Sequence, residues 1–111
     1  MGLDQYAFKR KLKKSEEIMY WRKHSKLQQW YVETFGKDIG EVILNKEHIK
    51  EIRELTKNDR MPYCEGGFFW GSQFQDDPEF AKQNKDATLE FCDKALKAIK
   101  EGCDVIYGCS W

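Results

Sequence analysis

The sequence lacks any long apolar run. A membrane-spanning helix needs roughly 20 consecutive apolar residues, and no segment of the 111 residues approaches that length. Residues 1–6 also lack the apolar stretch of a secretory signal peptide. The chain begins Met-Gly, but Tyr6 stands where a myristoylation signal requires Ser or Thr. We therefore expect a soluble protein that acts in the cytoplasm.

Paired cysteine motifs are also absent. The chain has four cysteines, and none belongs to a C-x-x-C pair. Cysteines of cytoplasmic proteins stay reduced and serve as small apolar side chains, so we expect four free thiols, no metal and no other cofactor. A zinc site that uses them with His24 or His48 is the alternative, although the spacing matches no ligand pattern.

The chain lacks net charge, with 19 Lys/Arg and 19 Asp/Glu, but the charges are unevenly placed. Residues 1–30 hold eight basic and three acidic residues, a net charge of +5, and the remainder carries −5. Much of the excess lies in a basic cluster made of Lys9, Arg10, Lys11, Lys13 and Lys14. Such a cluster attracts a phosphate backbone or an acidic partner. A solvated connection between a strand and a helix is the simpler interpretation, and we favour it.

Aromatic residues are plentiful, and the remaining patterns predict one domain. The chain contains 4 Trp, 5 Tyr and 7 Phe, and its length suits a single domain with its own core. The predicted strands are residues 3–9, 41–44, 66–71 and 103–111, and the predicted helices are residues 15–35, 46–57 and 85–100. These elements predict an α+β fold, with a small mixed or antiparallel sheet and about three helices packed mainly on one face.

Capping residues and apolar periodicity support the three helices. Ser15 and Asn45 are suitable N-caps, Pro78 marks the entry to the third helix, and Gly36 and Gly102 are suitable stops. The predicted buried face of the first helix consists of Tyr20, Trp21, His24, Leu27, Tyr31, Val32 and Phe35. The predicted buried face of the third consists of Thr88, Leu89, Cys92, Ala95, Leu96 and Ile99.

His24 is the strongest single candidate for chemistry. It falls among aromatic residues on the apolar face, and histidine serves widely as a general base or ligand. A structural role in the core is the alternative, and we favour it. No Ser-His-Asp or Cys-His arrangement can be read from the spacing.

The segment Gly66–Gly71 is the second candidate. Its glycines allow close approach of a ligand, and its aromatic residues, Phe69 and Trp70 among them, can stack on a flat group. It matches no phosphate-binding signature, and a core strand is the alternative. Two further patches have simple explanations: Trp21-Arg22-Lys23 as the border of a buried face, and the acidic residues 76–79 as partners of a helix dipole rather than of a metal.

An ordered set of short motifs runs through the chain: Met1–Ala7, Tyr20–His24, Trp30, Gly67–Gly71 and Ser110-Trp111. In these motifs the sequence resembles a family of short proteins of tailed phages, including cyanophages, and of bacterial prophages. It departs from that family in having Trp70 where Phe is more usual. The resemblance implies a phage origin and the cytoplasm of an infected host cell, and it supplies no activity, cofactor or site residue.

These observations favour a phage accessory protein that acts as a non-enzymatic binding module on a host factor, in host takeover or counter-defence. The alternative is a small enzyme or a nucleotide-ligand-binding protein with a pocket around His24 and Gly66–Gly71. Binding to nucleic acid is less favoured, and we expect a monomer or a homodimer. The candidate ligand- or partner-binding residues are Trp21, Arg22, His24, Trp30, Gly67, Phe69 and Trp70.

Overall fold

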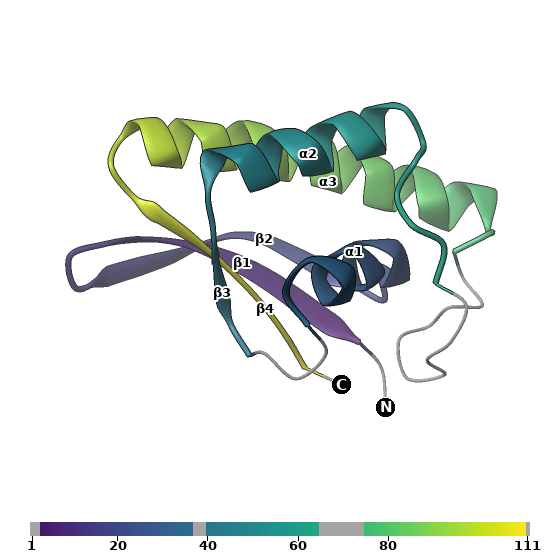
Figure 1. Cartoon of the computed structure of the whole chain (residues 1–111), viewed down its shortest axis with the longest axis horizontal. Helices are drawn as coiled ribbons and strands as arrows, with labels where there is room; N and C mark the ends of the chain where they lie inside the picture. The colour runs from purple at the N-terminus through teal and green to yellow at the C-terminus, as the bar shows by residue number, and fades with distance from the viewer. Residues whose placement is uncertain (1–2, 37–39, 65–74, 111) are drawn as a thin grey trace.

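The computed structural model describes residues 3–36, 40–64 and 75–110. Within them, four strands form one antiparallel sheet and three helices pack against it (Figure 1). The elements in chain order are β1 (Asp4–Lys11), β2 (Lys14–Arg22), α1 (Ser25–Phe35), β3 (Val42–Leu44), α2 (Lys46–Lys57), α3 (Pro78–Lys100) and β4 (Asp104–Ser110). The predicted α+β class is confirmed. The predicted strand at residues 66–71 lies outside the described residues.

The first and last strands lie at the centre of the sheet, whose order is β2-β1-β4-β3. Alternation along β1 sends Gln5 and Ala7 into the core, whereas Tyr6 and Phe8 share the opposite face with ring centroids 5.3 Å apart. Figure 1 shows α2 and α3 running side by side across the sheet. The core lies between these helices and the inner face of the sheet.

The predicted helix at residues 15–35 is wrong in its first half. Residues 14–22 form β2, which pairs with β1 from Lys11↔Lys14 to Asp4↔Arg22, and α1 begins only at Ser25. A β-bulge shifts the register between Ala7 and Phe8, so that Ile18 and Met19 both contact the core. The bulge thereby removes the alternation by which a strand is recognised.

Helix α1 lies on the same face of the sheet as the other two helices. Tyr31 packs on Tyr107 of β4 with ring centroids 5.0 Å apart, and Trp30 lies 6.1 Å from the ring of His48 at the start of α2. His24 therefore precedes this helix instead of lying within it, and Leu27, Trp30 and Tyr31 provide its buried apolar face.

The predicted N-cap of α2, Asn45, and the predicted entry to α3 at Pro78 are confirmed. Asn45 Oδ1 accepts the backbone N–H of His48 at 2.8 Å, and His48 Nδ1 accepts the backbone N–H of Asn45 at 3.1 Å, which completes a capping box. Asp77 Oδ1 accepts the N–H groups of Glu79 and Phe80 at the start of α3. The acidic cluster there is explained by capping and by the helix dipole.

The buried face of α3 is rotated from the prediction. The residues that the structure buries are Thr88, Phe91, Cys92, Ala95 and Ala98. Leu89, Leu96 and Ile99 are only half-buried, because the stripe through Phe91 faces the sheet whereas Leu96 and Ile99 pack at the border of the core. Phe91 lies edge-on to Trp21 at 5.0 Å.

Candidate functional site

The sequence-derived candidates occupy different environments. Trp21 and Trp30 are buried in the core, Arg22 is exposed at the end of β2, and His24 is buried just before α1. The remaining candidates, Gly67, Phe69 and Trp70, lie outside the described residues. The structure therefore does not bring the seven candidates together into one described site.

The two buried indoles have packing roles. Trp21 Nε1 donates to Thr88 Oγ1 at 3.2 Å, and its ring contacts Phe91. Trp30 packs against Phe35, with ring centroids 6.0 Å apart. Since both side chains are enclosed by the core, neither presents a surface to a partner in this structure.

His24 is tied into a buried polar network. Its backbone N–H donates to Gln5 Oε1 at 2.8 Å, and its carbonyl accepts from Gln5 Nε2 at 3.0 Å. Its ring Nε2 lies 3.0 Å from Thr88 Oγ1. Gln5 Nε2 also donates to the Tyr107 hydroxyl, which in turn donates to Gln28 Oε1 at 2.7 Å. The turn that precedes α1 is thus fastened to the centre of the sheet.

Burial keeps the His24 imidazole neutral. Desolvation, with a smaller contribution from the positive charge of Lys26, lowers the pKa of His24 to about 3. At physiological pH the side chain of His24 is therefore uncharged and does not act as a cation. Since Nε2 pairs with Thr88 Oγ1, Nδ1 is the ring nitrogen that is left for a further hydrogen bond.

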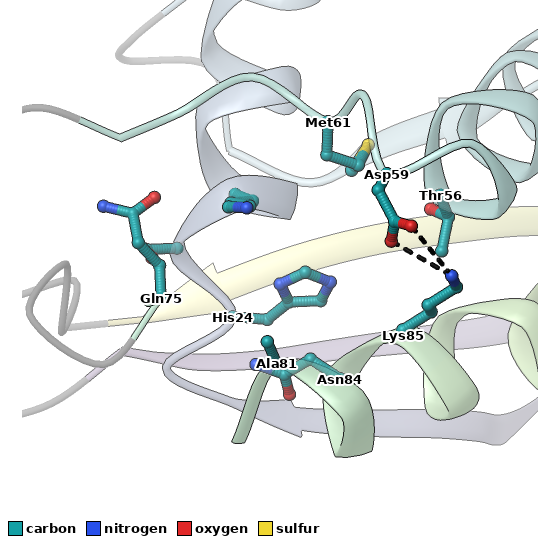
Figure 2. Close-up of a pocket in the computed structure, with 10 residues that line it drawn as sticks. His24, Thr56, Asp59, Met61, Gln75, Ala81, Asn84 and Lys85 are labelled. Carbon is teal, nitrogen blue, oxygen red and sulfur yellow. Dashed lines mark hydrogen bonds and ion pairs between the residues drawn. The ribbon is translucent and has the colours of Figure 1, made fainter. Parts of the chain in front are cut away.

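His24 lines a pocket where three helices meet. The pocket has a volume of about 70 Å³, and Figure 2 shows the His24 ring with Gln75 on one side, α3 below, and Asp59 and Lys85 opposite. The lining residues are His24, Ser25 and Lys26 at the start of α1, Thr56, Asp59 and Met61 at and beyond the end of α2, and Gln75, Ala81, Asn84 and Lys85 in or before α3.

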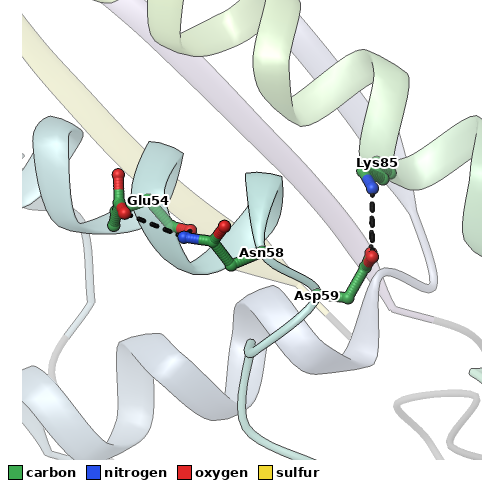
Figure 3. A network of polar contacts seen from close by, with 4 residues as sticks. All are labelled: Glu54, Asn58, Asp59 and Lys85. Atoms are coloured by element: carbon green, nitrogen blue, oxygen red, sulfur yellow. Dashed lines mark hydrogen bonds and ion pairs between the residues drawn. The ribbon is translucent and has the colours of Figure 1, made fainter.

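An ion pair closes one side of this pocket. Lys85 Nζ lies 3.0 and 3.2 Å from the two carboxylate oxygens of Asp59, and it joins α3 to the turn after α2 (Figure 3). Asp59 adopts a left-handed φ of 55°, directly after Asn58, whose amide donates to Glu54 Oε1 at 2.8 Å. The end of α2 thereby places the Asp59 carboxylate at the pocket.

The sequence did not identify Ser25, Thr56, Asp59 or Lys85 as site residues. They come from three elements far apart in the chain, and no local motif links them. His24 is the single pocket residue that sequence analysis selected.

A second unusual feature is the tip of the β1–β2 hairpin, which projects beyond the helices in Figure 1. Leu12 and Lys13 form a two-residue turn between the paired residues Lys11 and Lys14. Leu12 has a left-handed φ of 57° and its side chain is 92% exposed. The basic cluster therefore lies on a hairpin, and its prediction as a strand-to-helix connection is wrong.

Other potential chemistry has little support in the described residues. No group of three or more His, Cys, Asp and Glu side chains there could hold a metal ion. All four cysteines are free thiols, and burial raises the pKa of Cys92 to about 12. None of the described helices is both long and apolar enough to cross a bilayer.

No protein-family model, curated protein or solved structure matches this chain. The geometry of its own residues therefore carries the functional argument.

Proposed function

We propose that this protein is a non-enzymatic binding module, and that the tip of its β1–β2 hairpin engages an acidic protein of the host cell. The tip is defined here as Lys11–Lys14. The observation that carries the proposal is Leu12, an apolar side chain that is 92% exposed in a backbone conformation typical of glycine. The resemblance to tailed-phage proteins suggests the host cell as the setting.

The conformation of Leu12 is unfavourable without a compensating function. A two-residue hairpin turn with positive φ at its first central position favours Gly there, and a left-handed conformation costs a residue with a Cβ roughly 1–2 kcal/mol. The side chain gains no burial in return. Residues that break local rules in this way concentrate at functional sites.

The charges around Leu12 favour an acidic partner. Lys9 and Arg10, at the base of the tip, lie 3.5 Å from Glu16 and 3.7 Å from Asp104. Lys13 and Lys14 make no ion pair within the described residues. These two lysines beside an exposed apolar side chain are complementary to a partner surface that has carboxylates around a small apolar hollow. Complementary charge speeds the encounter, and burial of the Leu12 side chain adds affinity.

A protein fits this surface better than nucleic acid does. Leu12 can gain apolar contacts from a protein hollow, whereas a phosphate backbone offers it none. The partner is therefore expected to be a protein with a negatively charged contact surface.

The test is affinity capture from host cells with matched variants, followed by binding measurements on the purified partner. Leu12→Gly removes the apolar contact and relieves the backbone, so it should weaken binding at least about tenfold and leave stability equal or raise it by about 1 kcal/mol. Lys14→Glu should weaken binding similarly through repulsion. Lys50→Glu, on the exposed face of α2, is the charge control and should bind normally.

Three outcomes would contradict the proposal. The partner could bind Leu12→Gly and Lys14→Glu as well as it binds the parent. Capture could be abolished by nuclease, which would identify nucleic acid as the ligand. Binding could also fall equally with Lys50→Glu, which would show that overall charge, and not the tip, determines it.

A further inference from the structure

The pocket beside His24 contains hydroxyl groups that the protein leaves unpaired. In the described part of the chain, four buried side-chain polar atoms have no hydrogen-bond partner, and Ser25 Oγ and Thr56 Oγ1 are two of them. Both residues line the pocket, and they are 1% and 5% exposed. Buried hydroxyls without partners are destabilising. Their position at an open pocket indicates that a bound group supplies the missing hydrogen bonds.

The start of α1 adds further donors at the same place. His24 occupies the N-cap position of this 11-residue helix, but its side chain makes no capping hydrogen bond, and the first turn contains no acidic residue. By contrast, Asn45 and Asp77 cap α2 and α3. The first N–H groups of a helix have no partner within the helix and carry partial positive charge. The N–H of Ser25 already donates to the Lys23 carbonyl at 2.9 Å. The N–H groups of Lys26 and Leu27, together with the two hydroxyls, therefore form the set of donors that favours an anion.

The charges that line the pocket permit an anion of small size. Among the described residues that line the pocket, Lys26 and Lys85 are opposed only by Asp59, which Lys85 already holds at 3.0 Å. His24 is neutral and adds no charge, because burial keeps its pKa low. The pocket has a volume of about 70 Å³, which leaves room for one oxyanion group.

We propose that this pocket binds a small oxyanion, the shared chemistry being a phosphate or carboxylate group, with the hydroxyls of Ser25 and Thr56 and the backbone N–H groups of Lys26 and Leu27 as donors. The anion is either free or the terminal group of a larger molecule. This site is separate from the hairpin tip, so it stands or falls independently of the proposed partner. It also gives the pocket around His24 a defined ligand class.

The experiment is an amide NMR titration of the whole chain with inorganic phosphate, ethyl phosphate and acetate, and with chloride at the same ionic strength as the control. The amide signals of Lys26 and Leu27 should shift and saturate with at least one oxyanion and stay in place with chloride. Comparison of inorganic phosphate with ethyl phosphate distinguishes a free anion from the end of a larger molecule.

Variants separate binding from folding. Ser25→Ala and Thr56→Val should each weaken oxyanion binding about tenfold, while the melting temperature without ligand stays equal or rises, because an unpaired hydroxyl is removed. Thr56→Ser keeps the hydroxyl and should retain binding. Ser15→Ala and Thr34→Val, at exposed positions, are the matched controls and should bind like the parent.

The proposal is overturned if no oxyanion gives a saturable shift at concentrations up to about 10 mM. It is equally overturned if Ser25→Ala and Thr56→Val bind as tightly as Ser15→Ala and Thr34→Val. A fall in melting temperature for both pocket variants would show that the hydroxyls have partners inside the fold.

Discussion

At the scale of single residues, the core depends on a chain of polar side chains. Gln5 is fully buried at the centre of the sheet, and it satisfies both the backbone N–H and the carbonyl of His24 while it also contacts Tyr107. This arrangement gives buried polar atoms the partners that burial demands. It also holds His24 in its buried position, where desolvation keeps the imidazole neutral: its backbone is fixed by Gln5, and its ring by Thr88.

The first prediction concerns the pH dependence of stability. The pKa of His24 is lowered to about 3 in the folded protein, against about 6.5 in the unfolded chain. As pH falls below about 6.5, the unfolded state takes up a proton at His24 before the folded state does. The free energy of unfolding is therefore unaffected by His24 above that pH and declines as pH falls towards 3. Unfolding by urea should show that protonation at His24 lowers the free energy of unfolding by about 2 kcal/mol between neutral pH and pH 5.

The control for that measurement is His24→Gln, whose amide can still reach Thr88 but does not titrate. Both proteins share all carboxylates and differ in titration only at residue 24. The stability of the variant should therefore depend less steeply on pH than that of the parent between pH 7 and pH 5. If the two proteins lose stability in parallel, the imidazole is not held neutral by the fold.

At the scale of elements, what could be predicted depended on local signals. Asn45 and Asp77-Pro78 marked two helix starts correctly, because caps act within a few residues of the helix end. The segment 14–22 was missed, because its strand pairing is tertiary and its bulge hides the alternation. Lys23, which follows β2, has a left-handed φ of 57°. A glycine there would have indicated a turn in the sequence, but a lysine does not.

The candidate site was predictable only in part, for the same reason. His24 was identified by its residue type and its apolar surroundings, which are local properties. Ser25, Thr56 and Lys85 meet only because α1, α2 and α3 converge. Contacts between elements that are distant in the chain give no local sequence signal in any of those elements. The exposed Leu12 could not be recognised either, since its turn exists only once β2 is known to be a strand.

The second prediction tests the orientation of α3. Phe91 is fully buried against Trp21, whereas Leu96 is half-buried at the border of the core. Phe91→Ala should therefore destabilise the protein by about 3–5 kcal/mol, and Leu96→Ala by about 1–2 kcal/mol. Chemical denaturation of both variants measures the difference, with Phe91→Leu as a milder variant in case the alanine does not fold. Equal losses would mean that the helix is rotated towards the orientation expected from the sequence.

At the scale of the whole molecule, the two faces of the sheet differ. The helices cover one face, and the other carries Tyr6, Phe8 and the half-exposed Ile43. On that face the ring of Tyr6 lies over Gly108, where an added Cβ would come within 2.7 Å of Tyr6 Cε2. An aromatic ring over a strand glycine covers backbone that would otherwise meet water. The helix-covered face therefore holds the core, and the hairpin tip extends from the sheet at its margin.

The last prediction uses the cysteines to compare local with global opening. Cys92 lies in the core with its Sγ 3.8 Å from the carbonyl of Ile49, and burial raises its pKa to about 12. A thiol must be both accessible and deprotonated to react. Cys103 and Cys109 are half-buried, whereas Cys64 is buried.

Alkylation of the native protein, followed by peptide mapping, measures this difference, and the reagent should modify Cys103 and Cys109 first. Cys92 should react only at the rate of global unfolding, and all four thiols should react in urea. Modification of Cys92 as fast as Cys103 under native conditions would show that α2 and α3 separate from the sheet without unfolding of the rest.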